Sequence, residues 1–234
     1  MNIRVLASSS AGNAYILDDG SAPLLIEAGI RYKEIQQALG FKVCGLAGCL
    51  ISHSHGDHSK SAKDIVKAGV GCYLSAETAD ALGLTGHRVK VVAPLETFNV
   101  GLWRVLPFPT VHDVDGSLGF LLAHRDGEKV LFITDSAYCK YRFTGLTHIM
   151  IETNYSLEIL RQNVANGTLD LATKNRIVRT HMGLETVKEF LRANDLSRVE
   201  EIHLIHLSND NSDEERFKRE IQGLTGKPTY IGRK

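Results

Sequence analysis

The chain has 234 residues, of which 43% are hydrophobic and 23% are charged, a composition typical of a globular protein with a substantial core. Lysine plus arginine and aspartate plus glutamate each number 27, so the formal net charge is zero. This balance excludes a broadly basic protein that coats nucleic acid, but it does not exclude a local basic groove. The ten histidines are unusual, because histidine is useful mainly where protons or metals are handled.

The sequence contains no run of about 18 consecutive apolar residues, so it predicts no membrane-spanning segment. The apolar run at the amino terminus is too short for a signal peptide. The four cysteines, Cys44, Cys49, Cys72 and Cys139, form no Cys-x-x-Cys pair. A chain of this size needs no disulfide framework. These features predict reduced cysteines and a cytoplasmic protein.

The amino-terminal part of the chain alternates short apolar runs with helical patterns. Strands are predicted over residues 3–8, 15–18, 23–27, 48–52 and 72–75. Helices are predicted over residues 32–39, 59–68 and 76–82, and glycines follow the first two of them.

The middle of the chain has a β composition, and the carboxyl-terminal part is mainly helical. Strands are predicted over residues 89–92, 97–100, 103–108, 118–124, 129–134, 149–152 and 201–205. Asp126-Gly127 suits a hairpin turn, and helices are predicted over residues 157–164, 184–193 and 213–222. This order predicts two similar halves in one layered α/β domain, residues 1–234, with helices outside two sheets.

One short segment concentrates metal-binding side chains. His53-Ser-His55-Gly-Asp57-His58 follows an apolar strand and precedes a helix. Alternate residues of an extended segment point the same way, so His53 and His55 can share one metal ion. Asp57 and His58, at the turn into the helix, can face a second. Imidazole and carboxylate together suit Zn²⁺, Mn²⁺ or Fe²⁺.

This motif resembles the signature of the metallo-β-lactamase fold superfamily, and further motifs follow in the expected order. Residues 24–29 resemble its early strand-Asp-x-Gly motif, with Glu27 in place of the usual Asp. His112, Asp135 and His206 resemble its later ligands. Residues 8–13, His181-Met-Gly-Leu and residues 206–211 narrow the resemblance to the small YycJ-like phosphodiesterase and exonuclease branch.

The resemblance implies a four-layer αββα fold, with two mixed sheets sandwiched between helices. It also implies a dinuclear site. One metal would be bound by His53, His55 and His112, the other by Asp57, His58 and His206, and Asp135 would bridge them. Two such cations can hold a bridging hydroxide and clamp a phosphoryl group. The resemblance therefore predicts a dinuclear phosphodiesterase or DNA exonuclease with zinc, manganese or iron.

Other residues are candidates for catalysis and substrate binding. His181, beside such a site, could protonate the leaving oxygen or hold a phosphate oxygen, and Asp57 is expected to be catalytic as well as a ligand. Ser10 and Asn13 lie in a loop whose amides could hold phosphate, and Asn211 belongs to the late motif. Two basic clusters, 174–179 and 138–142, are each either a solvated face or a substrate contact.

Two other functions remain open from the sequence. The first is hydrolysis of a carbon-centred ester, thioester or lactone, because one fold supports many chemistries. The second is a metal-bearing scaffold without catalysis. The partner is expected to be a phosphodiester, with DNA, RNA and small nucleotides all compatible, and no membrane. The sequence predicts no oligomeric state.

Overall fold

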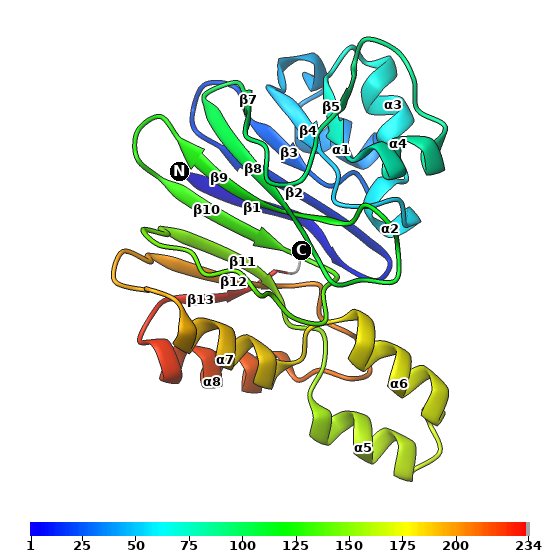
Figure 1. The fold of residues 1–234 in the computed structure, drawn as a ribbon, viewed down its shortest axis with the longest axis vertical. Coiled ribbons are helices and arrows are strands. Elements are labelled where there is room, and N and C mark those ends of the chain that lie inside the picture. Colours follow the sequence, from blue (N-terminus) through cyan, green and yellow to red (C-terminus); the bar gives the residue numbers. More distant parts are fainter. Residues whose placement is uncertain (233–234) are drawn as a thin grey trace. The chain divides into compact units, whose positions relative to one another are not determined.

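The chain divides into two compact units in the computed structural model, which describes residues 1–232 (Figure 1). Unit 1 comprises Met1–Pro109 and Val114–Gly127, and unit 2 comprises Thr110–Asp113 and Glu128–Gly232.

Unit 1 is built on a mixed six-stranded sheet with its strands in chain order. The strands are β1 (Asn2–Ser9), β2 (Gly12–Asp18), β3 (Leu24–Ile26), β4 (Gly48–Leu50), β5 (Cys72–Leu74) and β6 (Val89–Val91). The first three pair antiparallel and the rest parallel. Parallel pairing requires crossover connections, and helices supply them. These helices are α1 (Tyr32–Ala38), α2 (Gly56–Ser59), α3 (Ala62–Lys67) and α4 (Ala76–Leu82), with a short 3₁₀ helix η1 (Val43–Gly45).

Unit 1 also contains an antiparallel meander that packs against this sheet. Its strands are β7 (Phe98–Val100), β8 (Trp103–Pro109) and β9 (Leu118–His124). The rings of Tyr73 and Phe98 stack with centroids 5.0 Å apart, and the Leu118 amide donates to the Ser52 carbonyl at 3.0 Å. A buried cluster that includes Ile16, Leu25 and Ile65 forms the core on the sheet's other side.

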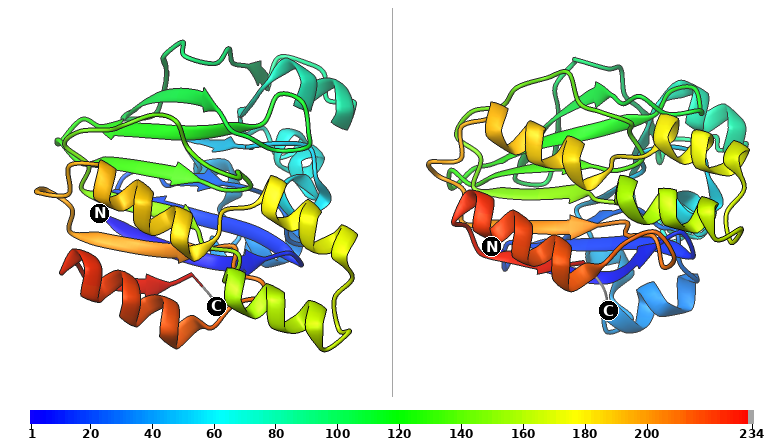
Figure 2. Two further views of the ribbon diagram at one scale, coloured as in Figure 1. Left: turned by 60° about the horizontal axis from the view of Figure 1, so that its bottom comes forward. Right: turned by 90° about the horizontal axis from the view of Figure 1, so that it is seen from below.

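Unit 2 is a parallel sheet with helical crossovers. Its strands are β10 (Lys129–Ile133), β11 (His148–Glu152), β12 (Glu201–Ile205) and β13 (Thr229–Ile231). Its helices are α5 (Leu157–Ala165), α6 (Leu171–Thr180), α7 (Leu184–Ala193) and α8 (Glu214–Thr225). Helices α7 and α8 lie side by side along the strands, and α5 and α6 form a separate hairpin (Figures 1 and 2).

The described strands thus make up two mixed sheets, β1–β6 and β7–β13, combined with helices, and the predicted α/β class is confirmed. The predicted elements exist, mostly within two residues of their expected bounds. One began too early: the helix expected over residues 59–68 starts at Ala62 as α3, and residues 56–59 form a separate short helix, α2, that was not predicted. The cause lies at Ser61, whose amide donates to the Ala28 carbonyl and whose hydroxyl donates to the Ile30 carbonyl, which takes the backbone out of the helix. Helix α6 and strand β13 were not predicted.

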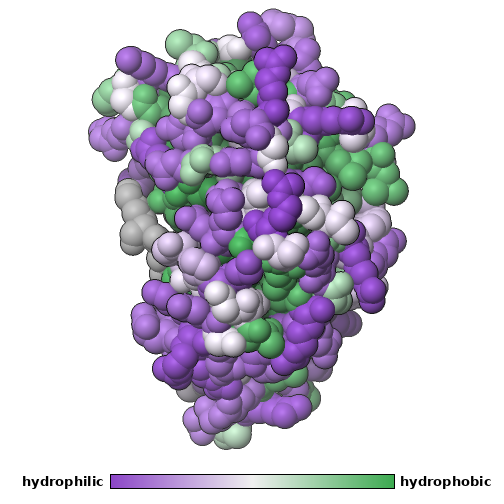
Figure 3. Space-filling model, turned by 90° about the vertical axis from the view of Figure 1, so that its left-hand side faces the viewer, coloured by the Kyte–Doolittle hydropathy of each residue, from purple (hydrophilic) through white to green (hydrophobic). Residues whose placement is uncertain are grey.

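In the described part of the chain, no helix is long and apolar enough to cross a membrane. The face of the molecule drawn in Figure 3 is mainly hydrophilic, with hydrophobic residues in small patches.

Candidate metal centre

The polar residues singled out by the sequence follow the carboxyl ends of parallel strands. In unit 1, Glu27 follows β3 and His53 lies three residues after β4. In unit 2, Asp135 lies two residues after β10, Glu152 ends β11 and His206 follows β12. Because parallel neighbours end at the same edge of a sheet, residues far apart in the sequence meet there, the usual position of ligand sites in such sheets.

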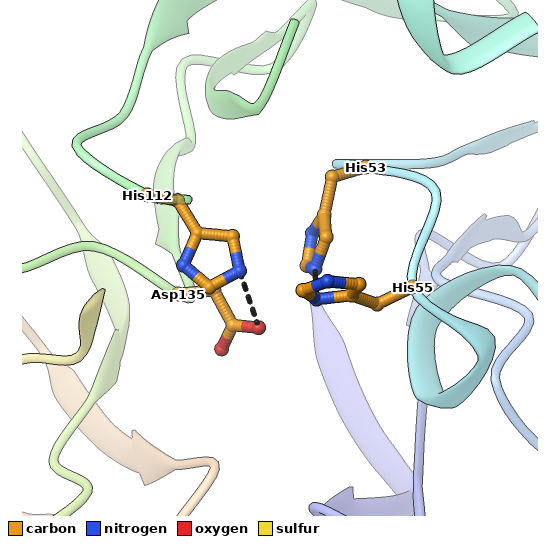
Figure 4. Close-up of side chains that lie close together, drawn as sticks. All are labelled: His53, His55, His112 and Asp135. Carbon is orange, nitrogen blue, oxygen red and sulfur yellow. Dashed lines mark hydrogen bonds and ion pairs between the residues drawn. The ribbon is translucent and has the colours of Figure 1, made fainter. Parts of the chain in front are cut away.

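The four motif residues of unit 1 form one group, here called the first cluster: His53, His55, Asp57 and His58. Nε2 of His53 lies 3.1 Å from Nδ1 of His55, and the two rings approach edge to face (Figure 4). The His53 ring also lies 4.3 Å from the His58 ring, measured between centroids. Nε2 of His58 lies 3.3 Å from an Asp57 carboxylate oxygen. The structure therefore gathers three imidazoles and one carboxylate.

Buried polar groups position this cluster. Glu27 is fully buried, and its carboxylate accepts from the Ser52 amide at 3.2 Å and lies 3.7 Å from Nδ1 of His58. Ser52 in turn bonds Nδ1 of His53 at 2.8 Å. The Asn13 amide nitrogen lies 3.2 Å from Nε2 of His58 and donates to the Asp57 carbonyl. Contacts of this kind fix the orientation of ligand histidines.

Gly29 completes the early motif for a steric reason. A Cβ atom at this position would lie 1.6 Å from the carbonyl oxygen of Asp57. Only glycine permits this approach between the loop after β3 and the start of α2. The Glu-Ala-Gly motif therefore has two roles: a buried carboxylate beside His58 and a gap for the Asp57 backbone.

Unit 2 contributes a second cluster, consisting of His112, Asp135, Glu152, His181 and His206. Nε2 of His112 lies 3.7 Å from the Asp135 carboxylate, the ion pair drawn in Figure 4. Nδ1 of His206 lies 3.2 Å from Asp135 and donates to Glu152 at 3.0 Å. The rings of His181 and His206 stack with centroids 5.5 Å apart.

Glu152 is the functional residue that the sequence analysis missed. It is fully buried, and Oε1 accepts from Nδ1 of His181 at 2.6 Å. Oε2 accepts from the amides of Ser136 and Met182, each at 3.1 Å. The sequence does contain one indication of it: a carboxylate at the end of an otherwise apolar strand. Burying an unpaired charge there would cost free energy, so a partner is expected.

Burial and neighbouring charges shift the pKa of these groups. Burial raises the pKa of Glu27, and the contacts with His58 and Ser52 offset this only in part. Burial also raises the pKa of Glu152, but His181 and His206 lower it more, so that it ends below its usual value. Burial lowers the pKa of His181, yet Glu152 and Asp135 raise it to about 10. Glu152, which is buried, and His181, which is partly exposed, therefore form a close ion pair.

Three residues of the centre have an unusual backbone conformation. In the described chain, five non-glycine residues have positive φ, and Glu27, Asp135 and His206 are among them, at 63°, 44° and 53°. Each follows a strand of the core. A residue with a side chain adopts positive φ at a cost in free energy, and surrounding contacts must hold it in that conformation. Such residues are common at functional sites.

The donor set fits a divalent metal ion. Within the described residues of unit 2, Asp135, Glu152, His181 and His206 each offer a ligand atom within 4.8 Å of the others. The first cluster offers three imidazoles and a carboxylate. Mixed imidazole and carboxylate ligands suit zinc, manganese and iron.

The predicted substrate-binding residues have different surroundings. Ser10 is exposed in the turn between β1 and β2. Asn13 is fully buried beside His58. Asn211 is buried, donates to Ser208 and accepts from the Asn163 amide, so its side chain ties its loop to α5.

The chain is similar to known proteins over most of its length. The model of the beta-lactamase superfamily domain matches residues 25–207. Exodeoxyribonuclease WalJ of Streptococcus pneumoniae is 28% identical over 228 residues, which cover 90% of this chain and 83% of WalJ. Exodeoxyribonuclease YycJ of Bacillus anthracis is 26% identical over 238 residues, which cover 94% of this chain and 88% of YycJ.

Solved structures agree on the fold. The metallo-β-lactamase fold protein YhfI of Bacillus subtilis superposes with a TM-score of 0.73 at 16% identity, covering 98% of this chain and 95% of YhfI. At this identity the likeness concerns the fold, and it confirms the predicted metallo-β-lactamase architecture.

Proposed function

Because the chain belongs to the beta-lactamase superfamily, in its YycJ-like branch, we propose that it is a metal-dependent exonuclease that hydrolyses phosphodiester bonds in DNA. The observation that carries the proposal is the set of imidazoles and carboxylates that each unit gathers at the carboxyl ends of its strands. The exodeoxyribonuclease names of its relatives favour DNA as the substrate.

We propose two divalent ions, zinc, manganese or iron, as cofactors. One would be held by His53, His55 and His112 and the other by Asp57, His58 and His206, with Asp135 shared. Such ions, when bound, lower the pKa of water and neutralise charge on phosphoryl oxygens. What supports this assignment is the motif order in the sequence and the donor groups within each unit.

The chain's own groups would orient the reaction and supply protons. His181 has its Nδ1 engaged by Glu152 at 2.6 Å, which leaves Nε2 to protonate the leaving oxygen or to hold a phosphate oxygen. Its side chain is 21% exposed, enough to meet a substrate. Asp57, 23% exposed, is the other proposed catalytic residue, as a ligand next to the reacting phosphate.

The remaining expectations are kept as proposals. Ser10, exposed in the turn between β1 and β2, is the candidate for a phosphate contact. Asn13 and Asn211 would act on the substrate through His58 and through the loop after β12. We also propose that residues 1–234 act as one domain in the cytoplasm, where four unpaired cysteines stay reduced.

The test uses purified protein with added Mn²⁺ or Zn²⁺. We expect hydrolysis of bis-(p-nitrophenyl) phosphate and progressive shortening of end-labelled DNA. Asp57→Ala should abolish both activities, whereas Asp80→Ala, an exposed carboxylate on α4, should leave them unchanged. Absence of turnover above the Asp57→Ala background on both substrates would contradict the proposal. Turnover of nitrocefin or a thioester alone would instead favour a carbon-centred hydrolase.

A further inference from the structure

A cavity in unit 2 lies beside the second cluster, and no proposed ligand lines it. Its volume is about 430 Å³. One wall is the segment from Tyr138 to Arg142. The other is a face of α7 that includes Thr186 and Phe190, together with Asn194, which directly follows the helix. Both walls start close to the centre: Tyr138 is three residues after Asp135, and α7 begins three residues after His181. The Cα atoms of Asp135 and Tyr138 are therefore at most about 11 Å apart.

We propose that this cavity binds a nucleotide of a single-stranded DNA substrate next to the phosphodiester that is cleaved. The inference rests on the proposed function and names a subsite for the strand. In this subsite Tyr138 would stack on a base, and Lys140 and Arg142 would contact phosphate groups.

The exposure of the lining residues fits this use. Tyr138 is 51% exposed, so much of its ring is open to a ligand. Lys140 and Arg142 are exposed as well, and Nζ of Lys140 lies 5.3 Å from the centroid of the Tyr141 ring. Aromatic rings that stack on bases, combined with cations along the backbone, are the common means of binding single strands. Glu189, an exposed residue of the lining, is the acidic group that opposes these two cations.

Hydrogen bonds hold the segment in place at both ends. The Ser136 hydroxyl accepts from the Val111 amide and donates to the Tyr138 carbonyl at 2.8 Å. At the far end, the Phe143 amide donates to the Asn194 side chain at 2.7 Å. A surface fixed before binding loses less conformational entropy when the ligand arrives, which favours affinity.

The position of the Tyr138–Arg142 segment also suits a strand that is cleaved at the second cluster. A strand whose phosphodiester lies at Asp135 and His181 extends beyond these residues and can follow a chain segment that leaves the second cluster. The Tyr138–Arg142 segment is such a continuation, with ring and charge at neighbouring positions. A minimal ester lacks the neighbouring nucleotide that the cavity would hold, so the subsite should matter for DNA and not for hydrolysis of a minimal substrate.

The experiment compares binding and turnover in the metal-loaded, full-length protein. Binding is measured by fluorescence anisotropy with a nuclease-resistant phosphorothioate oligothymidylate, and turnover with bis-(p-nitrophenyl) phosphate. The variants are Tyr138→Ala and Lys140→Ala. The matched controls are Tyr230→Ala, an aromatic residue of β13 that is 45% exposed, and Lys67→Ala, an exposed lysine of α3.

We expect Tyr138→Ala to weaken oligothymidylate binding roughly 5- to 150-fold, the range seen when a base-stacking aromatic is removed. Lys140→Ala should reduce the slope of log affinity against log salt by about 0.7. Hydrolysis of the small ester should stay at the parental level in both variants, and the controls should bind like the parent.

Two results would overturn the subsite. In one, both variants bind oligothymidylate like the parent. In the other, ester hydrolysis falls in parallel with binding, which would mean that the substitutions disturb the centre itself. If the proposed function itself is wrong, the result is different: the parental protein hydrolyses neither the ester nor DNA.

Discussion

At the residue scale, Glu152 explains how the second cluster is held. Its two oxygens accept four hydrogen bonds, from Nδ1 of His181, Nδ1 of His206 and the amides of Ser136 and Met182. Every partner is a donor, so the position requires a carboxylate with both oxygens as acceptors. The sequence motif points to His181 but not to this partner, because the pairing joins the end of β11 to a loop 29 residues later.

This arrangement makes a specific prediction for Glu152→Gln. The introduced NH₂ group would face donors, which leaves buried polar atoms unpaired at a cost of about 1–3 kcal/mol. His206, a proposed metal ligand that Glu152 contacts, would also lose its orientation, so we expect metal affinity to fall about 10- to 100-fold. Chemical denaturation and calorimetric metal titration measure the two effects. Glu215→Gln, at an exposed position of α8, is the control, and unchanged metal affinity in Glu152→Gln would refute the positioning role.

Other residues show what sequence patterns can and cannot reveal. The His-x-His-x-Asp-His spacing predicts the first cluster because its members are neighbours in the chain, and the structure brings them together. Two histidines outside these motifs have partners away from the two clusters: His124 pairs with Asp19 and His203 with Glu201. The positive φ of Asp135 depends on contacts with distant segments, so no local sequence pattern predicts it.

At the scale of elements, helix α6 shows why hydrophobic periodicity did not predict every helix. Of its ten residues only Thr180 is buried, and Leu171 is 58% exposed. The hydrophobic pattern that identifies a buried helix is therefore weak. Its start is instead marked by Asp170, whose carboxylate caps the helix by accepting from the Thr173 amide at 2.9 Å. By contrast, α7 has its apolar residues on one face, and its predicted bounds agree with the structure.

Helices α7 and α8 are joined by charges that make a pH prediction possible. Lys188 of α7 contacts Glu220 of α8, which also pairs with Arg216. The hydrogen bond from Lys188 and that from Arg216 lower the pKa of Glu220. Because the folded pKa is depressed, this carboxylate stabilises the protein above its unfolded pKa, and the contribution is lost as the pH falls through the folded value.

We therefore expect Glu220→Gln to lower the free energy of unfolding at pH 7 by about 0.5–1 kcal/mol, as is typical of partly exposed pairs. The difference from the parent should shrink as the pH is lowered below about 4.3, the ordinary pKa of glutamate in an unfolded chain. Urea denaturation at several pH values measures this dependence. A constant difference at all pH values would show that charge is not the cause.

At the scale of the whole molecule, the family's fold could be inferred from the order of its motifs, and the matching domain model confirms it. What the sequence could not provide is the set of contacts between strand ends, which arise only when β3 meets β4 and β10 meets β11 and β12. That residues 1–234 act as a single domain stays a prediction, and metal binding offers a way to test it.

The proposed ligands are contributed by both units, so metal binding should stabilise the molecule as a whole. A metal that binds only the folded protein raises the free energy of unfolding by about 2.7 kcal/mol when its free concentration is 100 times the dissociation constant. We expect Mn²⁺ or Zn²⁺ to raise the melting temperature of chelator-treated protein. His53→Ala in unit 1 and His112→Ala in unit 2, proposed ligands of the same ion, should each reduce this rise, and the double variant should lose no more than either single variant. His87→Ala, at an exposed position, should retain the full rise. If the losses of the two single variants instead add up in the double variant, each unit would bind its own ion, and the proposed shared site would have to be abandoned.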